Sequence, residues 1–169
     1  MSLFDDVGEF HKKMGLPTVH PYLKDNEPPH LLDQEVGLEA SRAMAFYFNE
    51  KLHSVLNIGD ALDGLFTYRT KFMLEELLEF ADAQYRADLP AAADALVDLV
   101  YVALGTAHLM GLPFDELWRT VQLANLQKER ATGADDPRSK RGHHLDVVKP
   151  VGWQAPDHVP VLLAHGWKP

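Results

Sequence analysis

Residues 89–112 read LPAAADALVDLVYVALGTAHLMGL, and this apolar segment is the main indication of the fold class. Ala, Leu and Val occupy nearly every position around the helix that these residues would form, which predicts a helix buried by neighbours on all sides. Two acids, Asp94 and Asp98, interrupt the apolar run one helical turn apart. A carboxylate buried in such a helix needs a cation, a proton or a wet pocket. These two acids are therefore the first candidates for a functional role.

The segments on either side of this stretch also read as helices, which predicts an all-α fold. The middle of the chain, residues 31–130, is rich in Ala, Leu and Glu and shows no convincing alternation of apolar and polar residues. Asp88 is a suitable N-cap for the apolar helix, with Pro90 in its first turn and Gly111 just after its end. Four helices are predicted, over about residues 32–56, 65–85, 89–110 and 114–130.

Glycine and proline cluster at the two ends of the chain, which predicts extended arms beside the helical core. We expect residues 1–133 to form the core, with residues 1–30 as an N-terminal arm. Residues 134–169 are expected to form a C-terminal arm that is not an independent domain. The segment 128–169 holds 5 acidic and 7 basic residues, although the whole chain has a net charge of −9. The C-terminal arm is therefore the concentrated source of Lys and Arg.

Composition argues against several classes of protein. The net charge of −9 disfavours non-specific binding to DNA or RNA, and the absence of cysteine removes disulfides, thiolate zinc sites and iron–sulfur clusters. The longest uncharged apolar stretch, Leu99–Phe114, has 16 residues and is too short to span a membrane. The acidic beginning MSLFDDVGEF does not look like a secretion signal. We therefore expect a soluble cytoplasmic protein without nucleic-acid or membrane partners.

A stripe of acids precedes the apolar stretch. Glu75, Glu76 and Glu79 fall within about 100° of one helix face, and Asp82 lies close to Glu75 on it. No Lys or Arg interrupts the stripe, so salt bridges within the helix do not explain it. Packing against the two acids of the apolar stretch would add repulsion, which a divalent cation such as Mg²⁺ or Mn²⁺ relieves. The alternative is a solvated acidic face, with Asp98 bonded to a buried Tyr or Arg.

At these residues the sequence resembles the all-α NTP pyrophosphohydrolases of the MazG-like superfamily, which are related to dimeric all-α dUTPases and phosphoribosyl-ATP pyrophosphohydrolases. The pattern of that family is E-E-x-x-E on one helix and E-x-x-D on the next, with Mg²⁺ between them. The first half is intact at residues 75–79. In the second half Ala95 stands three positions before Asp98, and Asp94 supplies an acid four positions before it. Both offsets present the side chain to the same helix face, so Asp94 is a plausible substitute.

Two later motifs extend the resemblance over about residues 65–157. VQLANLQK is similar to the family's N-x-x-K, with Asn125 and Lys128 one turn apart. KPVGWQAPD, residues 149–157, looks like the K-P-x-G-W-x-P-D tail of some members. The resemblance implies a four-helix bundle that assembles as a homodimer or a homotetramer.

The resemblance also implies an activity: hydrolysis of a (deoxy)nucleoside triphosphate to the monophosphate and pyrophosphate. It assigns metal ligation to Glu76, Glu79 and Asp98, with Asp94 as the substitute ligand, and it implies Mg²⁺ or Mn²⁺ at two or more ions per site. Glu75 would orient or deprotonate the attacking water, or share a metal. Purine triphosphates, dGTP or GTP, are favoured, and dUTP is the alternative within this class.

Substrate contacts are expected from the later motifs and from the C-terminal arm. By the resemblance, Lys128 would meet phosphate oxygens and Asn125 the sugar or a phosphate. The composition of the arm suits a segment that closes over a charged ligand, and Trp153 either stacks on a base or anchors the arm on the core. The basic residues of the arm that would contact phosphate are Arg138, Lys140, Arg141 and Lys149.

The first predicted helix carries more apolar residues than one buried stripe needs, so a second face is left for a partner. This surplus independently predicts a homo-oligomer. The apolar residues concerned are Val36, Met44, Phe46, Phe48, Leu52 and Val55.

Other interpretations of the acids remain open. One is a non-catalytic helical oligomer that carries them as a surface patch, and another is a regulator that binds nucleotides without hydrolysing them, which the departure at Ala95 suggests. A ferritin-like di-iron site needs two E-x-x-H motifs, and the sequence contains one, at residues 50–53. His143 and His144 with Asp146 are interpreted as a polar loop rather than a metal site.

Overall fold

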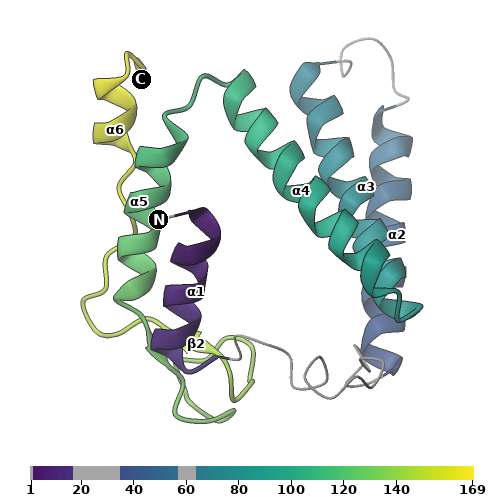
Figure 1. The fold of residues 1–169 in the computed structure, drawn as a ribbon, viewed down its shortest axis with the longest axis horizontal. Coiled ribbons are helices and arrows are strands. Elements are labelled where there is room, and N and C mark those ends of the chain that lie inside the picture. The colour runs from purple at the N-terminus through teal and green to yellow at the C-terminus, as the bar shows by residue number, and fades with distance from the viewer. Residues whose placement is uncertain (1, 17–34, 57–63) are drawn as a thin grey trace. The chain divides into compact units, whose positions relative to one another are not determined.

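The computed structural model describes residues 2–16, 35–56 and 64–169. The described residues form six helices and one pair of short strands, which confirms the predicted all-α fold (Figure 1). All four predicted helices are present, and the structure adds one helix at each end of the chain.

The chain divides into two compact units. The first, here called the helical unit, comprises residues 21–111, and the second, the terminal unit, comprises residues 1–20 together with 112–169. The boundary expected at residue 133 therefore falls inside the terminal unit.

The helical unit contains α2 (Glu35–Leu56), α3 (Leu65–Tyr85) and α4 (Leu89–Leu109), and α3 packs against both of the others. The predicted bounds of α3 agree with the structure residue for residue. Asp88 caps α4 as expected, because its side chain accepts a hydrogen bond from the backbone N–H of Ala91 at 3.1 Å. Residues 32–34, the predicted beginning of α2, lie outside the described residues.

Small side chains and one arginine hold α3 against α4. Nε of Arg69 donates to Oγ1 of Thr106 at 3.1 Å, and its Nη2 donates to the carbonyl of Val102 at 2.7 Å. Gly105 leaves room for this guanidinium, since a Cβ there would lie 2.7 Å from Nη2. The buried apolar residues of the two helices are Ala81, Ala83, Ala92, Ala95, Val102 and Ala107.

The prediction that α4 is buried on every side is wrong for the single chain. Val97 is 66% exposed and Tyr101 is 77% exposed, because α4 packs mainly against α3 and this leaves its other face uncovered. Asp98 is also exposed, so within one chain its carboxylate does not need a cation or a proton to compensate for burial. The exposed large apolar residues of α4 are Leu89, Leu96, Val97, Val100, Tyr101 and Leu109.

By length and composition, α4 is the one helix among the described residues that could cross a membrane. Core helices of soluble proteins pass the same test, so this is weak support for a membrane span. Asp94 and Asp98 lie within the apolar run, and a charged side chain at the centre of a bilayer costs roughly 2.5 kcal/mol or more.

The terminal unit begins with α1 (Leu3–Met14), which packs against α5 (Phe114–Leu126). Nε1 of Trp118 donates to the carboxylate of Asp6 at 2.7 Å, and this bond links the two helices. The expectation of an extended N-terminal arm is thus wrong for these residues. Ser2 and Asp5 form a capping box at the start of α1, because each side chain accepts a bond from the other's backbone N–H.

The rest of the terminal unit follows α5. Residues 129–130 form strand β1 (Glu129–Arg130), which pairs antiparallel with β2 (Val147–Val148), so α5 ends at Leu126 and not near residue 130 as predicted. A short helix, α6 (Val159–Ala164), closes the chain, and the C-terminal segment is therefore only partly extended.

Candidate functional site

Five acids on α3 and α4 form the candidate catalytic cluster, and Glu76 is the one most affected by the others. Its Oε2 atom is buried and has no hydrogen-bond partner. Burial raises the pKa of Glu76, and repulsion from four neighbouring acids raises it further. These neighbours, in decreasing order of effect, are Glu79, Asp98, Glu75 and Asp94. The four other predicted acids therefore lie close enough to Glu76 to disfavour its charged form.

The departure from the family pattern at Ala95 has a clear structural consequence. Ala95 is 2% exposed and belongs to the tightly packed part of α4, whereas Asp94 and Asp98 on either side of it are exposed. The substitute acid is therefore displaced from the buried position to the exposed surface of the helix. There, Asp94 lines a cavity together with Glu79 of α3.

The acids fit a hard divalent cation by chemistry, although they do not yet converge on one point. Within the described ranges, no group of three or more His, Asp or Glu side chains is close enough to hold an ion. The partnerless Oε2 of Glu76 is nevertheless an acceptor that a cation would satisfy. Carboxylate oxygens are also the ligands that Mg²⁺ and Mn²⁺ prefer.

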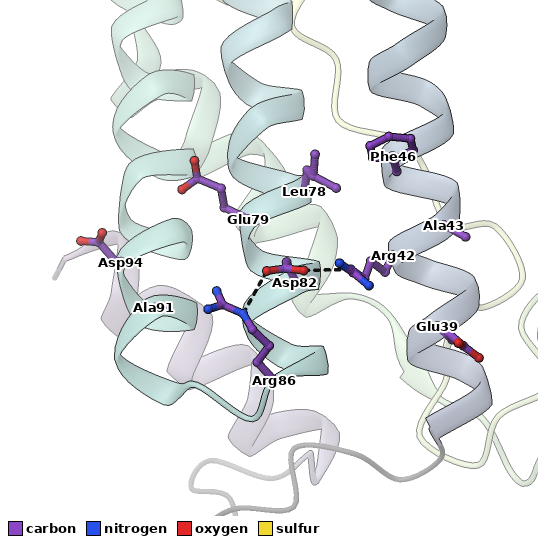
Figure 2. Close-up of a pocket in the computed structure, with 10 residues that line it drawn as sticks. All are labelled: Glu39, Arg42, Ala43, Phe46, Leu78, Glu79, Asp82, Arg86, Ala91 and Asp94. Atoms are coloured by element: carbon purple, nitrogen blue, oxygen red, sulfur yellow. Dashed lines mark ion pairs between the residues drawn. The ribbon is translucent and has the colours of Figure 1, made fainter.

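A cavity of about 780 Å³ opens beside the acidic cluster, within the helical unit (Figure 2). Asp82 lies in it and is paired with two arginines, Nε of Arg42 at 2.8 Å and Nε of Arg86 at 2.9 Å. The interpretation that no salt bridge explains the acidic stripe is therefore wrong at Asp82. Its partner Arg86 is four residues further along the chain, at the end of α3.

The terminal unit contains a separate basic cluster around Lys128. Nζ of Lys128 donates to Oδ1 of Asn125 at 2.7 Å, so the predicted pair is in contact. Burial lowers the pKa of Lys128, and repulsion from Lys149 and Arg141 lowers it further. Asn125, Lys128 and Arg141 line a cavity of about 430 Å³ within this unit. Two of the predicted cations thus line this cavity, together with Asp146.

Trp153 anchors the C-terminal segment on α5. Its Nε1 donates to the carbonyl of Ala124 at 2.8 Å, and Nζ of Lys149 lies 4.3 Å from the centre of its ring. Lys128 lies 5.6 Å from the same ring. The indole therefore positions two of the predicted phosphate-binding lysines.

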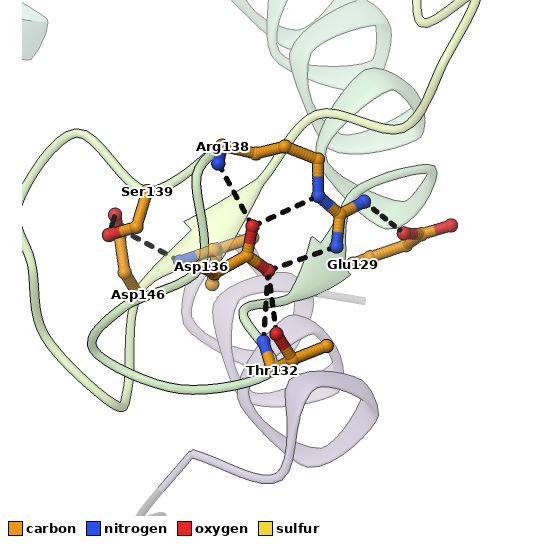
Figure 3. Close-up of polar contacts among 7 residues, drawn as sticks. Glu129, Thr132, Asp136, Arg138, Ser139 and Asp146 are labelled. Carbon is orange, nitrogen blue, oxygen red and sulfur yellow. Dashed lines mark hydrogen bonds and ion pairs between the residues drawn. The ribbon is translucent and has the colours of Figure 1, made fainter.

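The other predicted cations of the arm differ in their surroundings. Arg138 forms ion pairs with Asp136 and Glu129, as Figure 3 shows, and Arg141 pairs with Asp146 at 2.6 Å. These pairs stabilise the loop between β1 and β2. Lys140 is exposed on the same loop.

Sequence reasoning missed Asp136 and Asp146 as the centres of this loop. Both are buried, and hydrogen bonds hold the pKa of each well below its ordinary value of 3.8. For Asp136 the largest contribution comes from the side chain of Arg138, and for Asp146 from the hydroxyl of Ser139. The order Asp136-Pro-Arg138 was the available signal, because an aspartate followed by a bend often accepts bonds from the next residues.

Residues 49–125 match the family model described as phosphoribosyl-ATP pyrophosphohydrolase. This match confirms the resemblance to the MazG-like superfamily. The matched range covers the five acids and Asn125, whereas Lys128 and the basic residues of the C-terminal segment lie beyond it. No curated protein and no solved structure matches the chain. The MazG-like match supports a pyrophosphohydrolase that acts on a nucleotide.

Proposed function

We propose that this MazG-like protein hydrolyses a (deoxy)nucleoside triphosphate to the monophosphate and pyrophosphate, with Mg²⁺ or Mn²⁺ as cofactor. The observation that supports the proposal most strongly is the buried, partnerless Oε2 of Glu76, whose charge is disfavoured by burial and by four neighbouring acids. A protein that keeps such a cluster in the absence of a cation loses stability, so a role in binding one accounts for its presence.

Glu76, Glu79, Asp94 and Asp98 would hold the metal, two or more ions per site. When bound, the ions neutralise charge on the phosphates and favour attack by water. Because α3 and α4 are tied together by Arg69, their carboxylates are presented from a fixed pair of helices. Ligands on rigid elements pay less entropy to converge on a cation.

Glu75 is the proposed general base. Its carboxylate accepts a proton from water as the water oxygen bonds to phosphorus, and the bridging P–O bond breaks to release pyrophosphate. Attack at the α or the β phosphorus gives the same two products. Glu75 suits this role because it is half-buried next to Glu76 and takes no part in the ion pairs around Asp82.

In the terminal unit, Asn125, Lys128 and Lys149 are proposed to bind phosphate or sugar oxygens of the substrate. The pKa of Lys128 is lowered by burial and then by repulsion from neighbouring cations, and an anion in the cavity would relieve both effects. Arg141, which is 75% exposed at its side chain, and the exposed Lys140 are proposed to assist. Arg138 already forms ion pairs with Asp136 and Glu129, so we expect it to stabilise the loop and not to contact the substrate.

The proposal is tested by incubating the protein with each of the eight common NTPs and dNTPs in Mg²⁺ and separating the products by ion exchange. We expect one or a few triphosphates, with purines preferred, to give monophosphate and pyrophosphate. Two further nucleotides belong in the panel: phosphoribosyl-ATP, because the family model that matches carries its name, and dUTP, the alternative substrate. Preference for dUTP would assign the alternative substrate within the class.

Two outcomes would point away from an enzyme. Nucleotide binding without cleavage of any substrate in the panel would favour the regulator, in which Asp94 fails to replace the acid missing at Ala95. Indifference to both metal and nucleotide would favour a non-catalytic helical oligomer.

A further inference from the structure

The cavity of the helical unit holds two arginines that share a single carboxylate. Arg42 comes from α2 and Arg86 from the end of α3, and both guanidinium groups contact Asp82 (Figure 2). One carboxylate balances one of the two positive charges, so this Arg42–Asp82–Arg86 group keeps a net charge of +1. Within the cavity, the group is the source of positive charge.

The two guanidinium groups are held in place yet remain accessible. The Arg42 side chain is 48% exposed and lies over the ring of Tyr85, with 5.0 Å between its Cζ and the ring centre. The Arg86 side chain is 56% exposed and also pairs with Asp82 within one helical turn. A planar guanidinium fixed in this way retains N–H donors for a second, bidentate partner such as a phosphate.

The remaining walls of the cavity complement the two arginines. Glu79 and Asp94, two of the proposed metal ligands, line the side nearest the acidic cluster, and Phe46 and Leu78 provide apolar surface. Glu39 of α2 is a further acid in the lining, so the two arginines and a cation held by the metal ligands must together supply the positive charge for phosphate. The volume of about 780 Å³ is in the range that holds a small ligand. Acids for a metal, cations for phosphate and an apolar wall are the three surfaces that a metal-bound nucleotide requires.

We propose that Arg42 and Arg86 bind the phosphate chain of the nucleotide inside this cavity, with the nucleoside against Phe46 and Leu78. This inference rests on the proposed function and adds to it a second set of phosphate contacts, located in the same unit as the catalytic acids. It also changes the expectation that the C-terminal arm is the concentrated source of cations for the substrate, because the helical unit supplies its own pair. Asp82 pairs with both guanidinium groups in the free protein, and its negative charge competes with phosphate for them.

The test measures binding of inorganic pyrophosphate, in the presence of Mg²⁺, by isothermal titration calorimetry. Pyrophosphate carries the phosphate chemistry without a base and is not cleaved by the proposed reaction. The full-length protein carries Lys128→Gln throughout, which removes one of the phosphate contacts proposed for the terminal unit and leaves the others the same in every variant. Arg42→Gln and Arg86→Gln are compared with Arg119→Gln, an exposed arginine of α5 that does not line the cavity.

Arg86→Gln and Arg42→Gln should each weaken binding about tenfold to a hundredfold, the effect of losing one charge-assisted contact. Arg119→Gln should leave it unchanged. Asp82→Asn should preserve or tighten binding, because it removes the negative charge that competes with phosphate. Two results would show that the inference is wrong and that the group is a structural clamp between α2 and α3. One is unchanged pyrophosphate binding in both arginine variants while their melting temperature falls. The other is a loss of binding in Asp82→Asn as large as that in the arginine variants.

The experiments distinguish a failure of the inference from a failure of the proposed function. Pyrophosphate binding that depends on the arginines, in a protein that cleaves no nucleotide, would support the phosphate site and reject the hydrolase. In an active enzyme, Arg86→Gln should raise KM for the triphosphate more than it lowers kcat, since the contact is made to the substrate before and during the reaction. Hydrolysis with unchanged KM would reject the phosphate site and retain the hydrolase.

Discussion

At the scale of single residues, Glu76 is an acid whose charged form the fold disfavours. Its buried Oε2 lacks a hydrogen bond, and its raised pKa shows that the folded protein disfavours the charged form. Since the folded pKa is raised above the ordinary value of 4.5, ionisation of Glu76 destabilises the fold as the pH increases through that value. The metal-free protein therefore carries a stability cost at neutral pH that a bound cation would remove.

Because the charge of Glu76 destabilises the metal-free protein, removing that charge should have opposite effects on stability and on activity. Glu76→Gln should raise the melting temperature in EDTA by a few degrees, because about 1 kcal/mol corresponds to roughly 2–4 °C in a protein of this size. The same substitution should abolish metal-dependent hydrolysis. Thermal unfolding and turnover of this variant are compared with those of Asp115→Asn, an exposed acid of α5. A lower melting temperature in EDTA would contradict the assigned environment.

Asp136 provides the residue-scale prediction for pH. Hydrogen bonds from Arg138 lower its folded pKa below the ordinary value of 3.8, so its contribution to stability is complete above that value and is lost as the pH falls below it. Asp136→Asn should therefore reduce the dependence of unfolding free energy on pH between about pH 4 and pH 2. Denaturant unfolding across this range measures the slope. Asp135→Asn should keep the wild-type slope, and an unchanged slope in both variants would refute the prediction.

Several residue roles could be predicted from the sequence, and Asp82 shows where this fails. The acidic pattern at residues 75–79 located the cluster because helical spacing fixes which side chains share a face. One partner of Asp82, Arg86, stands four residues later and could have been predicted from that spacing. Its other partner, Arg42, comes from α2, and spacing within one helix carries no information about which cation a neighbouring helix presents.

At the scale of elements, the connection between α3 and α4 depends on Arg69 and on the absence of a side chain at Gly105. A Cβ at residue 105 would lie 2.7 Å from Nη2 of Arg69, so the guanidinium would have to leave its acceptors Thr106 and Val102. Gly105→Ala should therefore destabilise the protein by on the order of 1 kcal/mol, after subtracting the gain in helix propensity.

The matched control is Gly8→Ala in α1, where a Cβ would meet nothing within 4 Å. This variant should stabilise the protein by roughly 0.5–1 kcal/mol, because alanine has the higher helix propensity. Denaturant unfolding of both variants gives the comparison. Equal effects of the two substitutions would show that Arg69 does not depend on Gly105.

The presence of a helix could be predicted where the helical pattern of residues extends over many positions, as in α3 and α4. It was harder to predict where a few local residues determine the beginning or the end of a helix. The capping box of Ser2 and Asp5 could have predicted the start of α1 from the sequence. The Gly and Pro content of the N-terminal residues pointed instead to an extended arm. The end of α5 was misplaced because strand pairing between Glu129 and Val148 stops the helix. That pairing joins residues nineteen positions apart, which a local pattern does not reveal.

At the scale of the whole molecule, the uncovered apolar faces of α2 and α4 indicate a partner. Tyr101 and Val97 of α4 are more than 60% exposed, and Met44, Phe46 and Phe48 of α2 are more than half exposed. The side chains of Val36, Leu52 and Val55, which entered the same prediction, lie outside the described residues. A homodimer or homotetramer would bury such faces, at about 25 cal/mol for each Å² removed from water.

Multi-angle light scattering should give at least twice the chain mass of 19.0 kDa at micromolar concentration. Tyr101→Glu should shift the protein toward the monomer, because it places a charge in the proposed contact. A monomeric wild type would reject the assembly and leave the exposed faces of α4 unexplained.

The central claim is that the acids of α3 and α4 support cation-dependent release of pyrophosphate. It is tested most directly by ³¹P NMR of the reaction with the triphosphate preferred in the nucleotide panel, for wild type and Asp98→Asn, with Mg²⁺ and with EDTA. Asp98→Asn keeps the shape of the side chain while weakening metal ligation, and Asp98 is exposed, so the fold should persist. We predict resonances of monophosphate and pyrophosphate for the wild type in Mg²⁺ and in no other sample. Release of orthophosphate, equal turnover in EDTA, or wild-type turnover by Asp98→Asn would contradict the account.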